Sequence, residues 1–482
     1  HNDVFSCAPG MLLPISCTEV LPNEHYEINP QIFLRTMPLN SAAFVRMRQH
    51  IEFFFVPMRV LCRQFNQFVV GTKYPMSALS ALNDFSGQLP RISLATIRYW
   101  FNNLSGTDGL GIDLNKGSLR LLDLLGYGFT SVRDVNDKNY PQEYTSSGVT
   151  QASPSLNVFR FLSYQKIYQD FYRNPYWEPA NASTFNVDDL FNQELTDSSH
   201  SSRMKEFFQM RYRNWTKDFF TSVQPSFQGA PFVTRSINMN NFIVDSITGQ
   251  SFGVSDPSVK PISGIPSNSS SKVAALNVTT SDSLNIPVHN IRAAFALDKL
   301  IRLQQQSGNG SYGEQIKNRF GFGGVHDDWK ATYLGGSSSP ISIGEVITTA
   351  NTQSGDSPIG QTGDIYGKAS SVNDAKITFD TKEHGIIMGI FSVTPDADYN
   401  SFGIDPHNFK LNFEQFYQPE FDRLGHQPLN CYYLTCLSPT NMTTSISWLQ
   451  RVIGFQNRYL EYKTGFDKVH GQFCTGGSLS AW

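Results

Sequence analysis

The stretch VRMRQHIEFFFVP, residues 45–57, begins as an ordinary strand and ends in three consecutive phenylalanines and a Val-Pro pair. Side chains alternate between the two faces of a strand, so odd-numbered positions share one face and even-numbered positions share the other. The odd face is apolar nearly throughout and carries Phe53 and Phe55, whereas the even face is charged until it turns apolar at Phe54. Pro57 has no N–H for a ladder and is expected to end the strand. The pattern predicts a strand that enters a region covered on both sides, and it leaves open what forms the second cover.

The composition suggests a single sheet core with large insertions. The chain has 482 residues, of which 40% are hydrophobic, 13% are aromatic and only 16% are charged, against about 25% charged residues in typical soluble domains. Protein interfaces are depleted in Lys, Glu and Asp and enriched in aromatic residues. The composition therefore fits a chain that buries much of its outside against partners, and it fits equally well a β-rich secreted protein with a Ser/Thr/Asn surface.

The charge and cysteine content restrict the class further. The net charge of −3 means that the chain cannot by itself neutralise a nucleic acid, so any genome that it encloses needs cations from elsewhere. The six cysteines form no CxxC pair, and we interpret them as mostly buried thiols of a reducing compartment. No apolar run approaches the length of a membrane-spanning helix, and no signal-peptide pattern opens the sequence. Because the chain starts at His1 instead of Met, we expect that a leading segment was removed or left out of the numbering.

Strand-like and loop-like segments interleave along the chain. Residues 10–29 and 33–57 are expected to form paired strands with turns marked by Pro and Asn. Helical patches are expected within 60–104, an aromatic helix over 159–177 that Pro175 stops, and a capped helix over 290–308. Residues 136–155 and the Ser-, Pro- and Gly-rich 248–287 are predicted to be surface loops.

Motifs that carry chemistry are few. The glycine-rich GNGSYGEQ, residues 308–315, lacks the spacing of a phosphate loop. Glu383 and His384 are adjacent but have no placed nucleophile, so a structural histidine is the favoured interpretation. Two aspartate pairs could form a carboxylate pair or a calcium site, although turns use the same residues; they are Asp327 with Asp328 and Asp396 with Asp398. The sequence predicts neither an enzyme, a cofactor site nor a metal site.

Several blocks, taken in order, resemble the major capsid protein of the gokushovirus-like microviruses, small tailless icosahedral phages with single-stranded DNA. The similarity covers nearly the whole chain except residues 105–155 and 235–287. One departure is His426 in LGHQPLN, where the family pattern suggests Glu or Met, so no role carries over to it. The blocks are FSCAPGMLLPISCTEVLPNE, FLRTMPLNSAAFVRMRQHIEFFFVP, WTKDFFTSVQPSFQG, NIRAAFALDKLIRLQQQSGNGSYGEQIKNRFG, YLGGSSSPISIGEVITT, SPIGQTGDIYGK, EHGIIMGIFSVTP, FYQPEFDRLGHQPLN and GFQNRYLEYKTGFDKVHGQF.

The resemblance implies an all-β fold, an eight-stranded antiparallel jelly roll with long loop and helical insertions. It implies one capsid domain over residues 1–482 with strands from both ends of the chain, a mixed helical and loop insertion at 60–177, and a surface insertion at 235–287 that protrudes at the three-fold axis. It further implies a T=1 shell of sixty copies around a circular single-stranded DNA genome. The implied partners are a small basic internal protein, scaffolding and pilot proteins and a host surface receptor. The implied location is the virion, assembled in the host bacterial cytoplasm without membrane insertion.

The resemblance also suggests roles for the strand at 45–57. Phe53, Phe54 and Phe55 are expected to pack in the core, with an insertion or a neighbouring subunit covering Phe54. Arg46 and Arg48 face either the genome or plain solvent. Two rival functions are a secreted β-sandwich that binds or cleaves glycans, which should show paired carboxylates and a signal peptide, and a fibre or adhesin subunit, which should show internal repeats. None of these features is evident in the sequence.

Overall fold

The computed structural model describes about three fifths of the chain. By their internal contacts the residues form two units, 1–227 with 326–482, and 228–325, and the features below belong to the first. The expected loop at 248–287, the segment 308–315, Asp327 and Asp328 lie outside the described residues, as does nearly all of 136–155. Within the helix expected at 290–308, Phe295, Ala296 and Lys299 are described and helical. The described ranges are 2–37, 45–70, 88–97, 114–128, 154–191, 193–225, 329–347, 352–354, 357–360, 365–422, 426–436 and 451–480, with a few isolated residues between 295 and 349.

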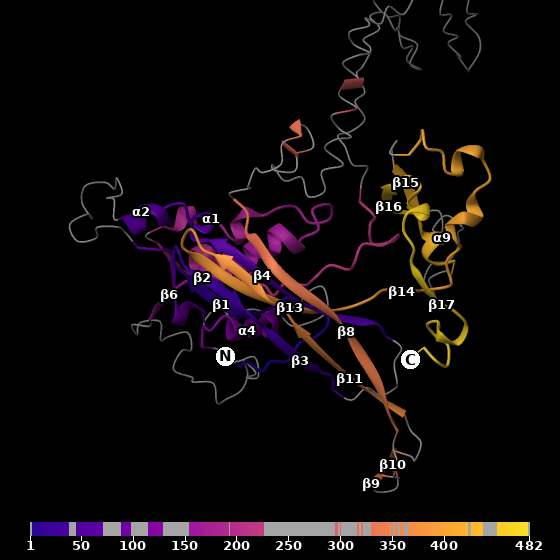
Figure 1. Cartoon of the computed structure of the whole chain (residues 1–482), viewed down its shortest axis with the longest axis horizontal. Coiled ribbons are helices and arrows are strands. Elements are labelled where there is room, and N and C mark those ends of the chain that lie inside the picture. The colour runs from indigo at the N-terminus through magenta and orange to yellow at the C-terminus, as the bar shows by residue number, and fades with distance from the viewer. Residues whose placement is uncertain are drawn as a thin grey trace, which may run out of the picture. The chain divides into compact units, whose positions relative to one another are not determined.

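The framework is a six-stranded antiparallel sheet that combines both ends of the chain (Figure 1). In spatial order its strands are β1 (Leu13–Val20), β13 (Gly385–Pro395), β4 (Met47–Pro57), β8 (Thr332–Ile347), β11 (Ile365–Asp374) and β3 (Gln31–Arg35). The expected strands in 10–29 and 33–57 are present, but the expected pairing between them is wrong. The reason is β13, a strand of 11 residues that are buried at all positions but the last. So apolar a strand is best placed in the middle of a sheet, and β13 separates β1 from β4.

Shorter sheets surround this framework. The pair β12 (Ile377–Asp380) and β2 (His25–Ile28) continues from β11 and β3, and a parallel pair joins β14 (Asp398–Asn400) to β17 (Asp467–Val469). The remaining strands are β5 (Arg91–Ser93), β6 (Ser155–Asn157), β7 (Glu194–Leu195), β9 (Thr352–Ser354), β10 (Ser357–Gly360), β15 (His426–Asn430) and β16 (Val452–Asn457).

The odd face of β4 packs inside the β structure. Phe53 and Phe55 join Ile51 and Ile387 of β13 in a cluster that the β12–β2 pair covers. The ring centroids of Phe55 and Phe379 are 5.0 Å apart. Two glycines of β13 make room for the rings. A Cβ added at Gly389 would lie 2.8 Å from the Phe53 ring, and one added at Gly385 would lie 2.3 Å from the Phe55 ring. The two strands therefore fit together only because β13 lacks side chains at these positions.

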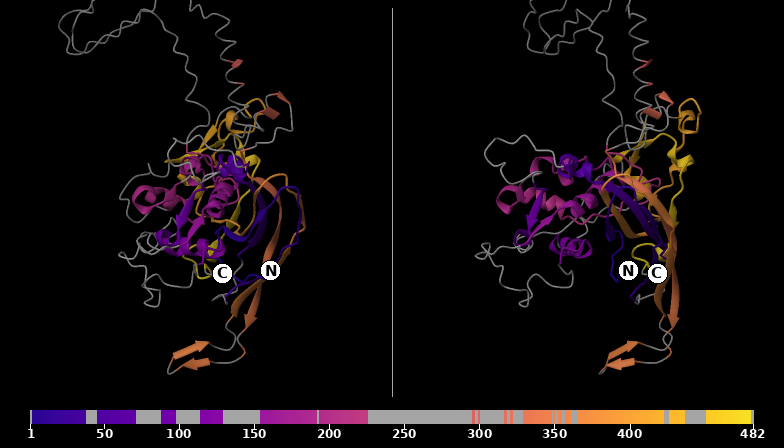
Figure 2. Two further views of the ribbon diagram at one scale, coloured as in Figure 1. Left: turned by 90° about the vertical axis from the view of Figure 1, so that its left-hand side faces the viewer. Right: turned by 60° about the vertical axis from the view of Figure 1, so that its left-hand side comes forward.

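The even face of β4 is covered by helices of the same chain. Phe54 lies between Phe171 and Tyr172, with ring centroids 4.8 and 5.8 Å away, and belongs to the largest apolar cluster. Figure 2 shows the purple and magenta helices gathered on one side of the sheet. The second cover of the strand is therefore an insertion of this chain. Its helices are α1 (Met58–Leu61), α2 (Phe65–Val70), α4 (Leu114–Leu124), α5 (Phe159–Ile167) with the π turn η2 (Tyr168–Tyr172), and α6 (Asp197–Phe207).

Several sequence predictions are confirmed. The described residues are rich in antiparallel β structure, consistent with a capsid β-sandwich, whereas the complete eight-stranded jelly roll and the single-domain organisation stay predictions. The aromatic helix at 159–177 is present and ends before Pro175. Two of the helical patches expected within 60–104 appear, as α2 and as residues 94–97. All six cysteines are free thiols, as expected, but the expectation that most of them are buried is wrong, because only Cys62 and Cys474 are. Among the described helices, none has the length and apolar character to cross a membrane.

Candidate functional site

Arg46 lies just before β4 and ties it to two other segments. Its guanidinium Nη2 donates to Asp398 of β14 at 2.8 Å and to Asp467 of β17 at 2.6 Å. These hydrogen bonds, that to Asp467 first, raise the pKa of Arg46 above its usual range. The arginine therefore joins the start of the central strand to the parallel pair β14–β17.

Arg48 has a similar but looser partner, because its Nε lies 3.8 Å from a carboxylate oxygen of Asp396. Two arginines thus face three carboxylates here, those of Asp396, Asp398 and Asp467, which leaves a formal charge of 2 − 3 = −1. A cluster with this balance attracts phosphate less than two free arginines would. The genome-facing role of Arg46 and Arg48 stays a prediction. The carboxylates of Asp396 and Asp398, considered from sequence as a metal site, each face an arginine instead.

The middle of the charged face is enclosed by the fold. Glu52 accepts hydrogen bonds from Arg213 Nη1 at 2.6 Å and from the Tyr172 hydroxyl at 2.5 Å. Next to it, burial and the charge of Arg213 lower the pKa of His50 to about 4, and the ring nitrogen of His50 lies 2.9 Å from the Thr394 hydroxyl. Only the arginine end of this face is well exposed.

The Glu383–His384 pair has contacts that suit a structural role. The Glu383 carboxylate binds the Arg59 guanidinium through two hydrogen bonds of 2.6 and 3.1 Å. The His384 ring packs edge-on against Phe65, and its carbonyl accepts from the backbone of Met58. These contacts attach the start of β13 to α1 and α2. Among the described residues, no group of three or more acidic, His or Cys side chains could hold a metal ion.

A further candidate surface was not predicted from the sequence. The C-terminal apolar patch consists of Leu411, Phe413, Phe416, Tyr417 and Tyr462, which expose between 42% and 86% of their surface. Monomeric proteins seldom expose large contiguous apolar patches unless they bind something. The sequence shows that these residues are apolar or aromatic, but their exposure depends on the tertiary fold.

Hydrogen bonds hold the C-terminal apolar patch in shape. The Gln415 side-chain oxygen accepts from the backbone of Leu411 and Asn412 at 2.6 and 2.9 Å. Lys410, almost fully buried, forms an ion pair of 3.0 Å with Glu461 and lies over the Tyr462 ring. These contacts hold the segment that carries the patch in a defined conformation, with its apolar side chains exposed.

His426, where the sequence departs from the family pattern, begins β15 and is half-buried. Burial lowers the pKa of His426 below its usual value, so the ring is neutral at pH 7. In the β15–β16 pair, His426 lies opposite Asn457.

Known proteins resemble this chain over nearly its whole length. The capsid protein (F protein) family matches residues 2–112 and 136–482. The capsid protein VP1 of Chlamydia phage 1 is 24% identical over 511 aligned residues, which cover 98% of this chain and 83% of the relative. The capsid protein VP1 of Bdellovibrio phage phiMH2K is 22% identical over 507 residues, with 98% and 81% covered. The family match covers nearly the whole of this β-rich chain, which shows that the chain belongs to the phage capsid protein (F protein) family.

Proposed function

We propose that this structural capsid protein assembles with its own copies into a T=1 icosahedral shell of sixty subunits around a circular single-stranded DNA genome. The observation that carries the proposal is the C-terminal apolar patch, which a subunit interface would remove from water. The low content of charged residues, 16%, supports extensive burial between copies. Scaffolding and pilot proteins, and assembly in the host cytoplasm, belong to the same proposal.

Electron micrographs and sedimentation of the purified protein test this function. We expect closed particles of uniform diameter that contain nuclease-resistant single-stranded DNA. A monomer that binds or cleaves glycans would instead support the secreted β-sandwich, and an elongated trimer would support a fibre subunit. Either of these outcomes contradicts the shell.

The net charge of −3 predicts a cationic partner inside the particle. The phosphates of an enclosed genome need counter-charges that this chain does not supply. We expect mass spectrometry of DNA-filled particles to find a short Lys- and Arg-rich polypeptide. The isolated chain should bind single-stranded DNA weakly with a small salt dependence. Tight binding with a steep salt dependence would contradict the proposal that a separate basic polypeptide neutralises the genome.

We also propose that the insertion at 235–287 contacts the host receptor. This segment lies outside the described residues, and its composition of hydroxyl side chains and prolines suits an exposed loop. Replacing residues 255–283 with a short Gly/Ser linker should leave particles intact and abolish or greatly reduce adsorption to the host. Normal adsorption of the shortened particles would exclude the receptor role, and failure to form particles would make the loop an assembly contact.

A further inference from the structure

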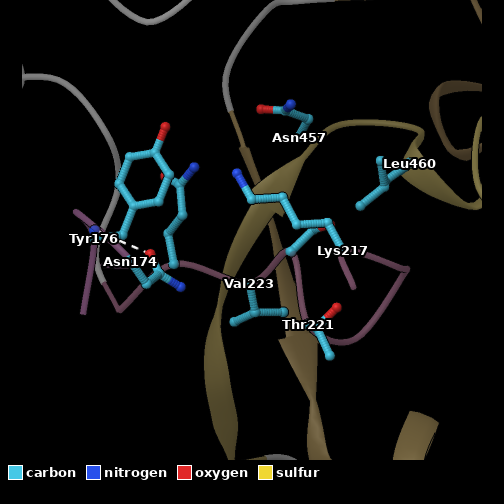
Figure 3. Close-up of a pocket in the computed structure, with 9 residues that line it drawn as sticks. Asn174, Tyr176, Lys217, Thr221, Val223, Asn457 and Leu460 are labelled. Carbon is cyan, nitrogen blue, oxygen red and sulfur yellow. Dashed lines mark hydrogen bonds between the residues drawn. The ribbon is translucent and has the colours of Figure 1, made fainter. Parts of the chain in front are cut away.

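A small polar pocket lies between the segment after η2, the turn at 217–224 and the end of β16 (Figure 3). Its volume is about 170 Å³, whereas pockets that enclose whole drug-sized ligands measure about 300 to 1,000 Å³. A pocket of this size suits one group of a longer ligand. Its lining includes Asn174, Tyr176, Lys217, Thr221, Gln224 and Asn457.

Lys217 is the only charged side chain in this lining. Its ammonium lies 5.9 Å from the centre of the Tyr176 ring, and Figure 3 shows the lysine side chain extending toward the tyrosine. The carboxylates nearest in sequence are Asp218, which follows Lys217, and Glu178, which is two residues after Tyr176. Both already accept hydrogen bonds from other groups. Asp218 accepts from the Tyr399 hydroxyl at 2.6 Å and from two backbone amides, and Glu178 accepts from the Tyr168 hydroxyl at 2.5 Å. The pocket therefore offers a positive charge beside an aromatic face.

The pocket wall also contains a buried amide oxygen that lacks a partner. Gln224 is 8% exposed, and its side-chain oxygen has no hydrogen-bond partner among the described residues. Buried polar groups are nearly always paired with protein, water or ligand. The unpaired oxygen of Gln224, at the pocket wall, points to a polar ligand that carries a hydrogen-bond donor.

One wall of the pocket is held in place by tertiary contacts. The backbone N–H of Tyr176 donates to the Asn174 side chain at 3.1 Å, and the indole N–H of Trp177 donates to the carbonyl of Val223 at 2.9 Å. Trp177 remains half exposed at this edge. These bonds fix the aromatic segment relative to the turn that carries Lys217.

We propose that this pocket receives one nucleotide of single-stranded DNA, with the base against Tyr176 and the phosphate at Lys217. An aromatic face beside a cation is the combination by which proteins hold single strands without reading their sequence. The unpaired oxygen of Gln224 can accept a hydrogen bond from the amino or imino group of a base edge. The inference rests on the proposed function, because it takes the enclosed genome as the ligand. A single lysine per subunit agrees with a chain whose net charge is −3.

Fluorescence anisotropy of the soluble protein with a labelled oligothymidylate tests the pocket. We expect Tyr176→Leu to weaken binding by about 5- to 150-fold, the range for loss of one base stack, and Tyr176→Phe to bind like the parent. Lys217→Ala should weaken binding and reduce the slope of log K against log salt by about 0.7, the value for one single-strand phosphate contact. The control is Lys376→Ala, which removes an exposed lysine paired with Glu27 and should change neither quantity.

If both Tyr176→Leu and Lys217→Ala bind with the parental affinity and salt slope, the pocket does not bind single-stranded DNA. Lys217 is exposed, so its variant should fold even if the tyrosine variant does not. A second measurement uses particles whose genome carries bromodeoxyuridine. After irradiation, we expect DNA-linked peptides that contain Tyr176 or Trp177. Crosslinks confined to other peptides would refute the DNA-binding role of the pocket but not the proposed DNA-filled shell. Particles without DNA would refute the proposed function, and the oligonucleotide assay would then decide whether the pocket binds DNA.

Discussion

Replacing Phe53 with alanine is expected to lower the free energy of unfolding by about 3 to 5 kcal/mol, the usual cost of removing a buried phenylalanine ring. Phe53 is 2% exposed and its ring faces Gly389, where no side chain is available to fill the space left behind. A loss of this size is a large share of the about 5 to 15 kcal/mol that stabilises a typical domain. Denaturant unfolding of the soluble protein, or its yield if it no longer folds, measures the effect.

Phe33→Ala provides the matched control for this substitution. Phe33 lies on β3 in the same sheet but is 59% exposed, and an exposed substitution should change the unfolding free energy by no more than about 0.5 kcal/mol. If Phe53→Ala unfolds at the same denaturant concentration as the parent and as Phe33→Ala, the odd face of β4 is not part of the buried core.

The alternation in residues 45–57 was sufficient to predict that β4 passes between two covers. It could not identify the strands beside it. Local sequence determines which residues of a strand face the same way, but the choice of neighbour depends on contacts across hundreds of residues. The register Phe53 to Gly389 and Phe54 to Met388 brings together segments that share no local pattern.

The same limit applies to the charged side chains. Sequence alone identified Arg46, Arg48 and the two aspartates at 396 and 398 as separate candidates for different chemistry. The structure pairs them with each other, because β13 delivers the aspartates to the start of β4. Ion pairs between residues about 350 positions apart depend on the sheet order, which no motif in either segment encodes.

Exposure was the property that the sequence could not supply. The aromatic residues in 411–417 have the composition of a core segment, and composition alone does not separate a buried ring from one at a subunit interface. The overall resemblance to capsid proteins predicted that such an interface exists. We propose that this interface lies at the C-terminal apolar patch, whose exposure only the fold reveals.

Introducing charge into this patch is expected to abolish particle formation. Leu411 and Phe413 are 86% and 74% exposed, so Leu411→Asp and Phe413→Asp should leave the fold of the subunit unchanged. In an assembled shell each new carboxylate would be buried without a partner, and an uncompensated buried charge costs several kcal/mol per site. Removing an aromatic anchor from an interface costs about 2 to 4 kcal/mol in addition. Every copy in a closed shell carries the same defect, so sedimentation should show free subunits in place of particles.

Phe413→Leu distinguishes loss of assembly from loss of folding, because it keeps an apolar side chain at the same position. We expect Phe413→Leu to form particles, and both aspartate variants to melt within a few degrees of the parent subunit. Normal particles from Leu411→Asp and Phe413→Asp would show that the C-terminal apolar patch faces solvent in the shell, and the copies would then have to meet through other surfaces. An aspartate variant that melts much earlier than the parent would instead place these side chains in the subunit core, which contradicts their exposure.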